Sequence, residues 1–196
     1  MKKRITLLVA LSVFILGCSL PRPAVSQDRK PPSSPTPPTP EERARAAEVM
    51  KELRNKWLTA DADEFGLEGE DAKAKVWGVM METALPSGVA TLISIRDGTA
   101  SLYTTGGGGV LGGYSAKAQA RQFVLAAEKH LARMKPTKEF PYPETGRVKF
   151  YVLTRAGVYT VDVDDKALWS ERHALHRLYR AGHEVLTGLR LASEKK

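Results

Sequence analysis

Residues 75–104 read KVWGVMMETALPSGVATLISIRDGTASLYT and carry the clearest secondary-structure signal in the chain. Here the period of the apolar residues changes from the 3.6 of a helix to the 2 of a strand. The sequence at 85–88 suits a type I turn, because proline is second and glycine fourth. Asp97-Gly98 is a hairpin signal. The run therefore predicts three consecutive antiparallel strands, over 76–83, 89–95 and 99–104.

A second β unit and three amphipathic helices are expected around this run. The second unit spans 147–163, with a turn at 155–157 between two strands. Thr39 and Glu42 form a capping box that begins the first helix at Pro40. The other helices are expected over 115–134 and about 175–191. Their apolar faces hold Ala46, Val49, Met50, Leu53 and Trp57 in the first, Ala120, Val124, Ala127, Leu131 and Met134 in the second, and Leu175, Leu178, Gly182, Val185, Leu186 and Leu189 in the third.

The order α-βββ-α-ββ-α predicts an α+β fold with a single antiparallel sheet of about five strands, covered by these helices. One globular domain is expected over 41–196. Its predicted core is Trp77, Leu92, Ile93, Leu102, Phe123, Val124, Phe150 and Val152. The element order resembles that of profilin-like and roadblock-like domains. That resemblance implies a sheet between helices and a binding or adaptor role, and it assigns no functional residue.

The N-terminus has the build of an export signal. Three basic residues at 2–4 precede an apolar run over 5–16, which is shorter than the about 20 residues that span a bilayer. The run ends in Ile15-Leu16-Gly17-Cys18, which resembles the lipobox of bacterial lipoproteins. The resemblance implies removal of residues 1–17, a diacylglycerol on the sulfur of Cys18, and acylation of the new amino terminus, for example with palmitate. The alternative is an ordinary secreted protein with a free thiol.

The expected location is therefore the cell envelope, with the protein held on a membrane through lipidated Cys18. Ser19 stands where lipoproteins of the inner membrane usually carry aspartate, so the outer membrane is favoured if the cell has one. Another envelope protein or a polymer is the expected further partner. Because Cys18 is the only cysteine, no disulfide is expected, and a packed core must stabilise the domain.

A proline-rich linker is expected over 18–40. Eight of residues 19–40 are proline, which favours polyproline II and a reach on the order of 65 Å. The net charge of +8 includes the three basic residues of the leader, and the remaining charge is scattered. An exported protein also seldom meets nucleic acid, so no nucleic-acid partner is expected.

Residues 106–113, GGGGVLGG, form the least ordinary stretch of the domain. Gly107, Gly109 and Gly112 spell G-x-G-x-x-G, yet the parallel βαβ unit of a dinucleotide site is missing. What remains is an anion-binding hypothesis at a helix N-terminus. It comprises Gly107, Gly109, Gly112, Lys117 and Arg121, with Tyr114 nearby. The favoured alternative is a flexible crossover that leaves the sheet edge.

No catalytic residue, cofactor or metal ligand is predicted. His176 and His183 are about 10.5 Å apart along a helix axis, so with His173 they are interpreted as a solvated helix face. The acidic stretch 61–71 lacks oxygen ligands where a calcium loop needs them and is interpreted as a solvated loop. The favoured hypothesis is a non-catalytic, lipid-anchored binding module. Its rival is a small-ligand (anion) binder or enzyme that uses the 106–113 loop.

Overall fold

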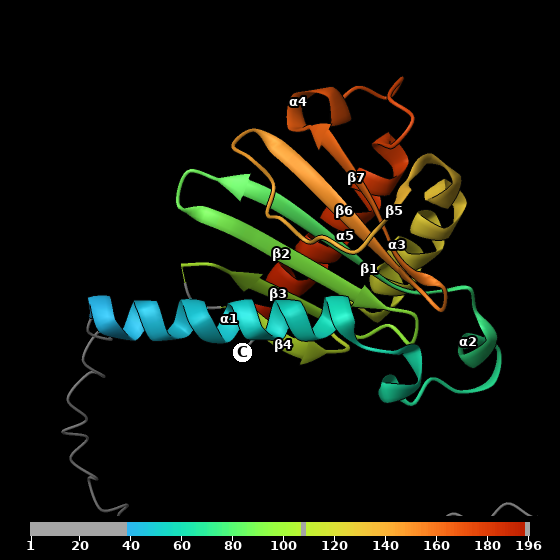
Figure 1. Cartoon of the computed structure of the whole chain (residues 1–196), viewed down its shortest axis with the longest axis horizontal. Coiled ribbons are helices and arrows are strands. Elements are labelled where there is room, and N and C mark those ends of the chain that lie inside the picture. Colours follow the sequence, from blue (N-terminus) through green and yellow to red (C-terminus); the bar gives the residue numbers. More distant parts are fainter. Residues whose placement is uncertain (1–38, 107–108, 195–196) are drawn as a thin grey trace, which may run out of the picture. The chain divides into compact units, whose positions relative to one another are not determined.

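Seven strands form one antiparallel sheet in the part of the chain that the structure, a computed structural model, describes: residues 39–106 and 109–194 (Figure 1). The order across the sheet is β4-β3-β2-β1-β6-β7-β5. The strands are β1 (Val76–Leu85), β2 (Gly88–Ile95), β3 (Ala100–Thr104), β4 (Gly109–Gly113), β5 (Lys135–Thr137), β6 (Arg147–Thr154) and β7 (Gly157–Asp164). The predicted α+β class with a single antiparallel sheet is confirmed, and so are the five predicted strands. Cys18 and the linker before Thr39 lie outside the described residues.

Strands β4 and β5 are additions to the prediction. The flexible crossover expected at 106–113 is in part an edge strand, because β4 pairs with β3. Gly109 has a φ of +151°, and a Cβ there would collide with the carbonyl oxygen of Leu102. Glycine at this position therefore lets the two backbones approach, although glycine is a poor strand former.

Helices α3 (Lys117–His130) and α5 (His176–Ser193) cover one side of the sheet, which we call the α3/α5 face (Figure 1). Helix α3 is shorter than predicted, because a 3-10 turn, Leu131–Arg133, follows it. Side chains from the strands and both helices form a continuous apolar core here. It includes Val79, Met81, Leu92, Ala120, Phe123, Val124, Phe150, Val152, Leu178, Val185 and Leu189. All residues predicted as core are buried on one face or the other, except Leu102, which is partly buried.

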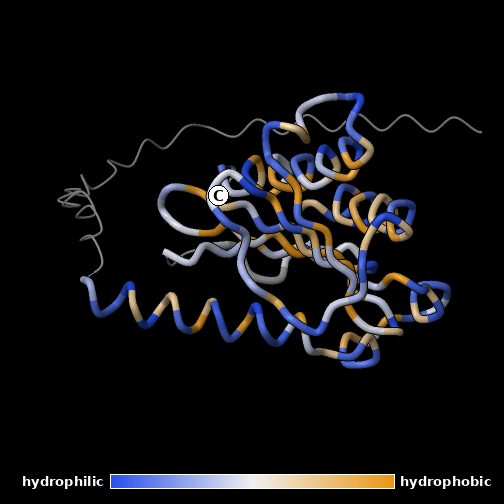
Figure 2. Tube along the Cα trace, turned by 45° about the horizontal axis from the view of Figure 1, so that its top comes forward, coloured by the Kyte–Doolittle hydropathy of each residue, from blue (hydrophilic) through white to orange (hydrophobic). Residues whose placement is uncertain are grey.

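Helix α1 (Pro40–Thr59) lies against the opposite side, the α1 face (Figure 1). Its predicted capping box is present, with the Thr39 hydroxyl accepting from the Glu42 amide at 3.2 Å. The side chains of the expected apolar stripe are only partly buried. Val49 remains 45% exposed, and the fully buried side chains of the helix are Arg54 and Leu58. The first turns are mostly exposed and stand apart from the sheet (Figure 2).

A buried ion pair joins α1 to the central strand of the sheet. The Arg54 guanidinium donates to both carboxylate oxygens of Glu82, at 2.5 and 2.9 Å, and the Thr91 hydroxyl donates to the same carboxylate at 3.0 Å. The ring of Tyr142 packs on the guanidinium, and Cζ of Arg54 lies 4.1 Å from the centroid of this ring. The pair therefore has the bidentate geometry and the extra donor that a buried charge requires.

The acidic stretch at 61–71 is more ordered than the solvated loop that was predicted. It contains a 3-10 turn, Ala62–Phe65, and the start of the short helix α2 (Gly69–Lys73). The ring of Phe65 stacks between Trp57 and Trp77, with centroid distances of 4.7 and 4.9 Å. Aromatic stacking thus fixes this connection on the α1 face. None of the described helices is long and apolar enough to cross a membrane.

Candidate functional site

The hypothesised anion site at the glycine-rich stretch is brought together only in part. Gly107 lies outside the described residues, whereas Gly109 and Gly112 belong to β4. A hollow of about 250 Å³ lies beside the stretch. It is lined by Leu85, Ser87, Gly88, Val89, Thr104 and Gly106, a set without a charged side chain. Neither Lys117 nor Arg121 lines it, so the hollow offers an anion no cation from these two residues.

The two cations of the hypothesis have different surroundings. Arg121 donates to both carboxylate oxygens of Asp71 in α2, at 2.9 and 3.2 Å. Lys117 begins α3, and its ammonium lies 5.4 Å from the ring centroid of Tyr114, whose hydroxyl donates to Asp97. The structure therefore brings Lys117 and Tyr114 together, while the guanidinium of Arg121 binds a carboxylate of the protein itself.

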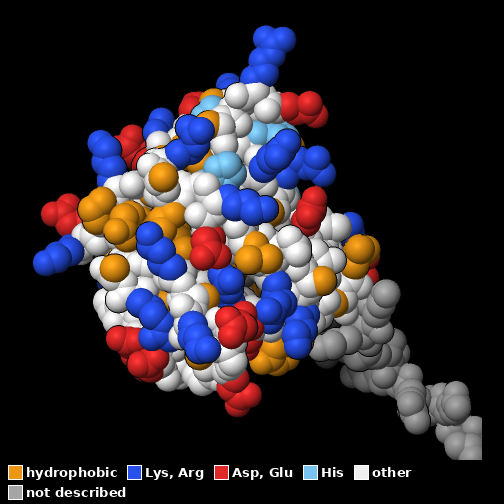
Figure 3. Space-filling view, turned by 90° about the vertical axis from the view of Figure 1, so that its right-hand side faces the viewer, with side chains coloured by type: hydrophobic (Ala, Val, Ile, Leu, Met, Phe, Trp, Pro, Cys, Tyr) orange, Lys and Arg blue, Asp and Glu red, His pale blue; other side chains and the backbone are white. Residues whose placement is uncertain are grey.

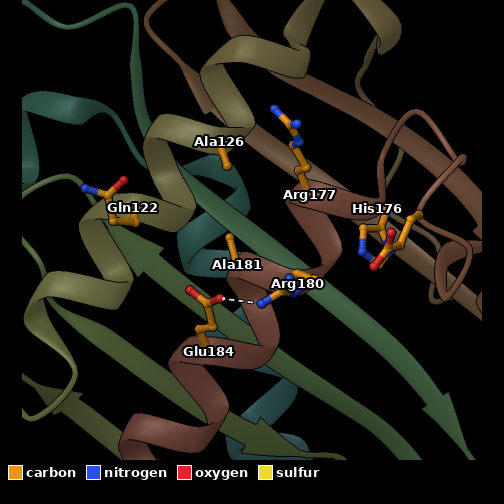
Figure 4. Close-up of a pocket in the computed structure, with 8 residues that line it drawn as sticks. Gln122, Ala126, His176, Arg177, Arg180, Ala181 and Glu184 are labelled. Atoms are coloured by element: carbon orange, nitrogen blue, oxygen red, sulfur yellow. Dashed lines mark hydrogen bonds and ion pairs between the residues drawn. The ribbon is translucent and has the colours of Figure 1, made fainter.

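A larger hollow, of about 530 Å³, lies between α3 and α5 (Figure 4). We call it the charged hollow. Its lining residues are Gln122, Ala126, Glu171, His176, Arg177, Arg180, Ala181 and Glu184. The Arg180 guanidinium and the Glu184 carboxylate are 3.4 Å apart and both are more than half exposed. An exposed pair of this kind is weak and can open to admit a ligand.

A second hollow, of about 290 Å³, shares four of these residues and has an aromatic wall. We call it the aromatic hollow. It is lined by Trp169, Glu171, His176, Tyr179, Arg180, His183, Glu184 and Thr187. The Trp169 ring meets Tyr179 edge-on at 5.3 Å and lies 5.4 Å from the ring of His183, yet Trp169 is 61% exposed. A large aromatic ring is thus held in place at the surface. Figure 3 shows histidine side chains among basic and acidic ones over one part of the surface.

Local structure explains why Trp169 has this position. Trp169 ends the short helix α4 (Asp165–Leu168), whose buried Leu168 anchors it in the core. The Leu168 carbonyl oxygen lies 2.9 Å from Nδ1 of His176. The Tyr179 hydroxyl donates to Asp165 at 2.6 Å. Burial and this hydrogen bond raise the pKa of Tyr179, so its hydroxyl remains protonated.

His183 carries a polar atom without a protein partner in the described part of the chain. Its Nε2 is buried and makes no hydrogen bond there. Burial lowers the pKa of His183, and the charge of Asp165 offsets this only in part, so the imidazole is neutral near pH 7. Buried polar atoms nearly always have a partner, so this nitrogen is an exception among the described residues.

The three C-terminal histidines differ from the solvated face that was predicted. His173, His176 and His183 are all half-buried, and the first two have hydrogen bonds to backbone atoms. Within residues 39–106 and 109–194, no three potential ligand side chains gather to hold a metal ion.

Sequence reasoning missed Trp169. The signal is a tryptophan outside the apolar pattern that is followed within 14 residues by Tyr179 and His183. These two are four residues apart and so share one face of a helix. No protein-family model, no curated protein and no solved structure matches the chain.

Proposed function

We propose that the chain is a lipid-anchored protein of the bacterial cell envelope whose domain binds a partner and catalyses no reaction. The observation that carries the anchor is the sequence Ile15-Leu16-Gly17-Cys18 at the end of a charged start and a short apolar run. Acylation at Cys18 and at its amino group supplies several chains, and more than one chain is needed for stable anchoring. The membrane favoured is the outer one, if the cell has two.

The open hollows beside α5 support the binding role. Their aromatic and titratable groups make contacts that hold the fold: Tyr179 bonds Asp165, and His176 bonds the Leu168 carbonyl. The hydrogen bonds of His173 and His176 in the described residues go to backbone atoms and not to a hydroxyl nucleophile. Such an arrangement suits recognition of a partner better than acid–base or nucleophilic chemistry.

The rival proposal is a small-ligand binder or enzyme at the 106–113 loop. It needs a cationic pair at the start of α3, whereas Arg121 is already engaged by Asp71. Titration of the whole chain with inorganic phosphate tests it, with Lys117→Ala as the variant. Saturable binding that the variant loses would favour the rival over the binding-module proposal.

Acyl labelling and fractionation test the anchor. The wild type should incorporate a palmitate analogue and sediment with membranes, whereas Cys18→Ser should incorporate none. Since the unprocessed variant can stay tethered by its uncleaved leader, a second variant replaces residues 1–18 with an ordinary cleavable signal peptide. That protein should be soluble and folded. An unlabelled wild type, or a retargeted domain that still sediments with membranes, would overturn the proposal.

A further inference from the structure

We infer that the aromatic hollow and the adjoining charged hollow form a binding site for an uncharged stretch of a polysaccharide, with Trp169 as the stacking platform. The inference names a ligand class for the binding role and rests on the proposed envelope location for its biological source. It makes its own physical claim about this surface, which is tested separately from the anchor.

Trp169 has the exposure that a stacking platform needs. The three tryptophans of the chain have different environments: Trp77 is 2% exposed, Trp57 donates its indole N–H to Tyr103 at 2.7 Å, and Trp169 is 61% exposed. Two ring contacts, with Tyr179 and His183, fix Trp169 while leaving most of its surface open. The face of an aromatic ring is electron-rich, and the C–H bonds on one side of a pyranose ring form a matching flat, weakly positive surface.

Polar side chains surround the aromatic hollow. A sugar hydroxyl donates one hydrogen bond and accepts others, so its site needs donors and acceptors side by side. Glu171 and Glu184 supply carboxylate acceptors, and Arg180 supplies guanidinium donors. The ring of His183 also lines this hollow, although its Nε2 is closed to solvent.

The opposite charges that line the two hollows balance, and this balance selects against ionic ligands. The charged residues of the two hollows are Glu171, Glu184, Arg177 and Arg180, two of each sign. An anion that approaches the arginines is repelled by the carboxylates. A cation that approaches the carboxylates is repelled by the arginines. A neutral ligand avoids both repulsions.

The size and arrangement of the two hollows suit an extended ligand. The hollows measure about 290 and 530 Å³ and share Glu171, His176, Arg180 and Glu184, so they lie next to each other. Each is within or close to the size of small-molecule clefts, about 300 to 1,000 Å³. Two adjoining compartments, one of them aromatic, suit consecutive units of a chain better than a single compact ligand.

The experiment uses the full chain in detergent and a panel of oligosaccharides. The panel holds an uncharged β-1,4-linked N-acetylglucosamine tetramer, an uncharged glucan and an oligomer of galacturonic acid. Calorimetry measures affinity, and tryptophan fluorescence reports on the platform. We expect an uncharged oligosaccharide to bind, the acidic oligomer to bind at least tenfold more weakly, and Trp169→Ala to lose about tenfold in affinity.

Two further variants make the result specific. Trp169→Phe keeps an aromatic ring and should retain most of the affinity. Tyr114→Ala removes an aromatic side chain that is 59% exposed elsewhere on the domain and should change nothing. Because both residues are exposed, the variants should fold, which thermal unfolding checks.

Three outcomes would overturn the inference: no uncharged oligosaccharide binds, the acidic oligomer binds as tightly, or Trp169→Ala binds like the wild type. Because the assay is done in detergent, it does not depend on acylation. Labelled protein that binds no glycan contradicts this inference alone, and glycan-binding protein without label contradicts the anchor alone.

Discussion

Beneath α3 and α5 the central strands bury Met81, Phe150 and Val152, whereas on the other face the same strands bury Glu82, Thr91 and Lys149. Met81 and Glu82 are consecutive residues, so the alternation of a strand sends one to each face. On the α3/α5 face these strand side chains are apolar, so close packing is their main requirement. On the α1 face every buried polar group also needs a partner of defined geometry.

The partners on the α1 face come from other elements of the structure. Arg54 lies 28 residues from Glu82, and the Lys149 ammonium is 3.1 Å from the Asp162 carboxylate. Burial lowers the pKa of Arg54, but the hydrogen bond and the charge of Glu82 outweigh burial and raise it, so the guanidinium stays charged. The sheet is therefore held mainly by apolar packing on the α3/α5 face, and by apolar packing together with buried charged pairs on the α1 face.

The largest expected effect is on the α3/α5 face. Phe150→Ala should lower the free energy of unfolding by about 3 to 5 kcal/mol, because it leaves a cavity beneath α3 and α5. Urea unfolding measures this loss. Phe140→Ala is the matched control, since Phe140 is only partly buried on the α1 face and should cost less. A loss well below 3 kcal/mol with the fold retained would contradict the assignment of Phe150 to the core.

Breaking the buried ion pair should cost nearly as much. Arg54→Met leaves the Glu82 carboxylate buried with the Thr91 hydroxyl as its remaining donor, and we expect a loss of about 3 kcal/mol. The double variant Arg54→Met, Glu82→Leu should recover most of the loss, because it removes both charges. Lys51→Met, in an exposed pair with Glu48, should change stability by less than about 0.5 kcal/mol. A double variant no more stable than Arg54→Met would show that the pair is not the reason.

A smaller effect is expected where α5 meets the sheet. A Cβ on Gly182 would lie 2.8 Å from the sulfur of Met81, at the flexible end of that side chain. Overpacking of about 1 to 3 kcal/mol is offset by the helix propensity of alanine, about 1 kcal/mol. Gly182→Ala should therefore lower the free energy of unfolding by about 1 kcal/mol, measured by urea unfolding. In a Met81→Ala background this contact is absent, so Gly182→Ala should there lower the free energy of unfolding by less. An equal loss in both backgrounds would contradict the contact with Met81.

The smallest effect depends on pH. Burial raises the pKa of Asp162, but hydrogen bonds from Arg147 and Lys149 outweigh burial and lower it. A carboxylate with a lowered pKa stabilises the fold above its unfolded pKa of about 3.9, and that contribution is lost as the pH falls through the folded value. Asp162→Asn should cost under about 1 kcal/mol at pH 6 and less at pH 3. Unfolding curves at the two pH values measure it, and an equal cost at both would contradict the charge argument.

Much of the fold follows from local sequence. The period of two in 75–104, the turn at 85–88 and the capping box at Thr39 each depend on neighbouring residues, and all are present in the structure. Strand β4 escaped prediction because its glycines have low strand propensity and its pairing with β3 is a tertiary effect. The buried Arg54 escaped because a charged residue on an apolar stripe gives no sign of a carboxylate 28 residues away.

The candidate site was harder to predict than the fold. Trp169, Tyr179 and His183 lie on two helices, and only the packing of α4 against α5 brings the three rings together. Lys117 and Arg121 are four residues apart on one helix, yet the carboxylate of Asp71 approaches from another segment and binds Arg121. In both cases the deciding neighbour belongs to another element of the structure.

Helix α1 gives the domain a mechanical property. At 1.5 Å per residue its 20 residues extend about 30 Å, and the side chains that fix it to the sheet, Arg54, Trp57 and Leu58, all lie in its second half. Tension on the chain ahead of Thr39 therefore acts on the outer end of a rigid lever. The torque falls on the Arg54–Glu82 pair and on the hydrogen bond from Trp57 to Tyr103. Under load, α1 should separate from the sheet before the strands are strained, which would lengthen the connection to the proposed anchor while the sheet and the surface around Trp169 stay intact.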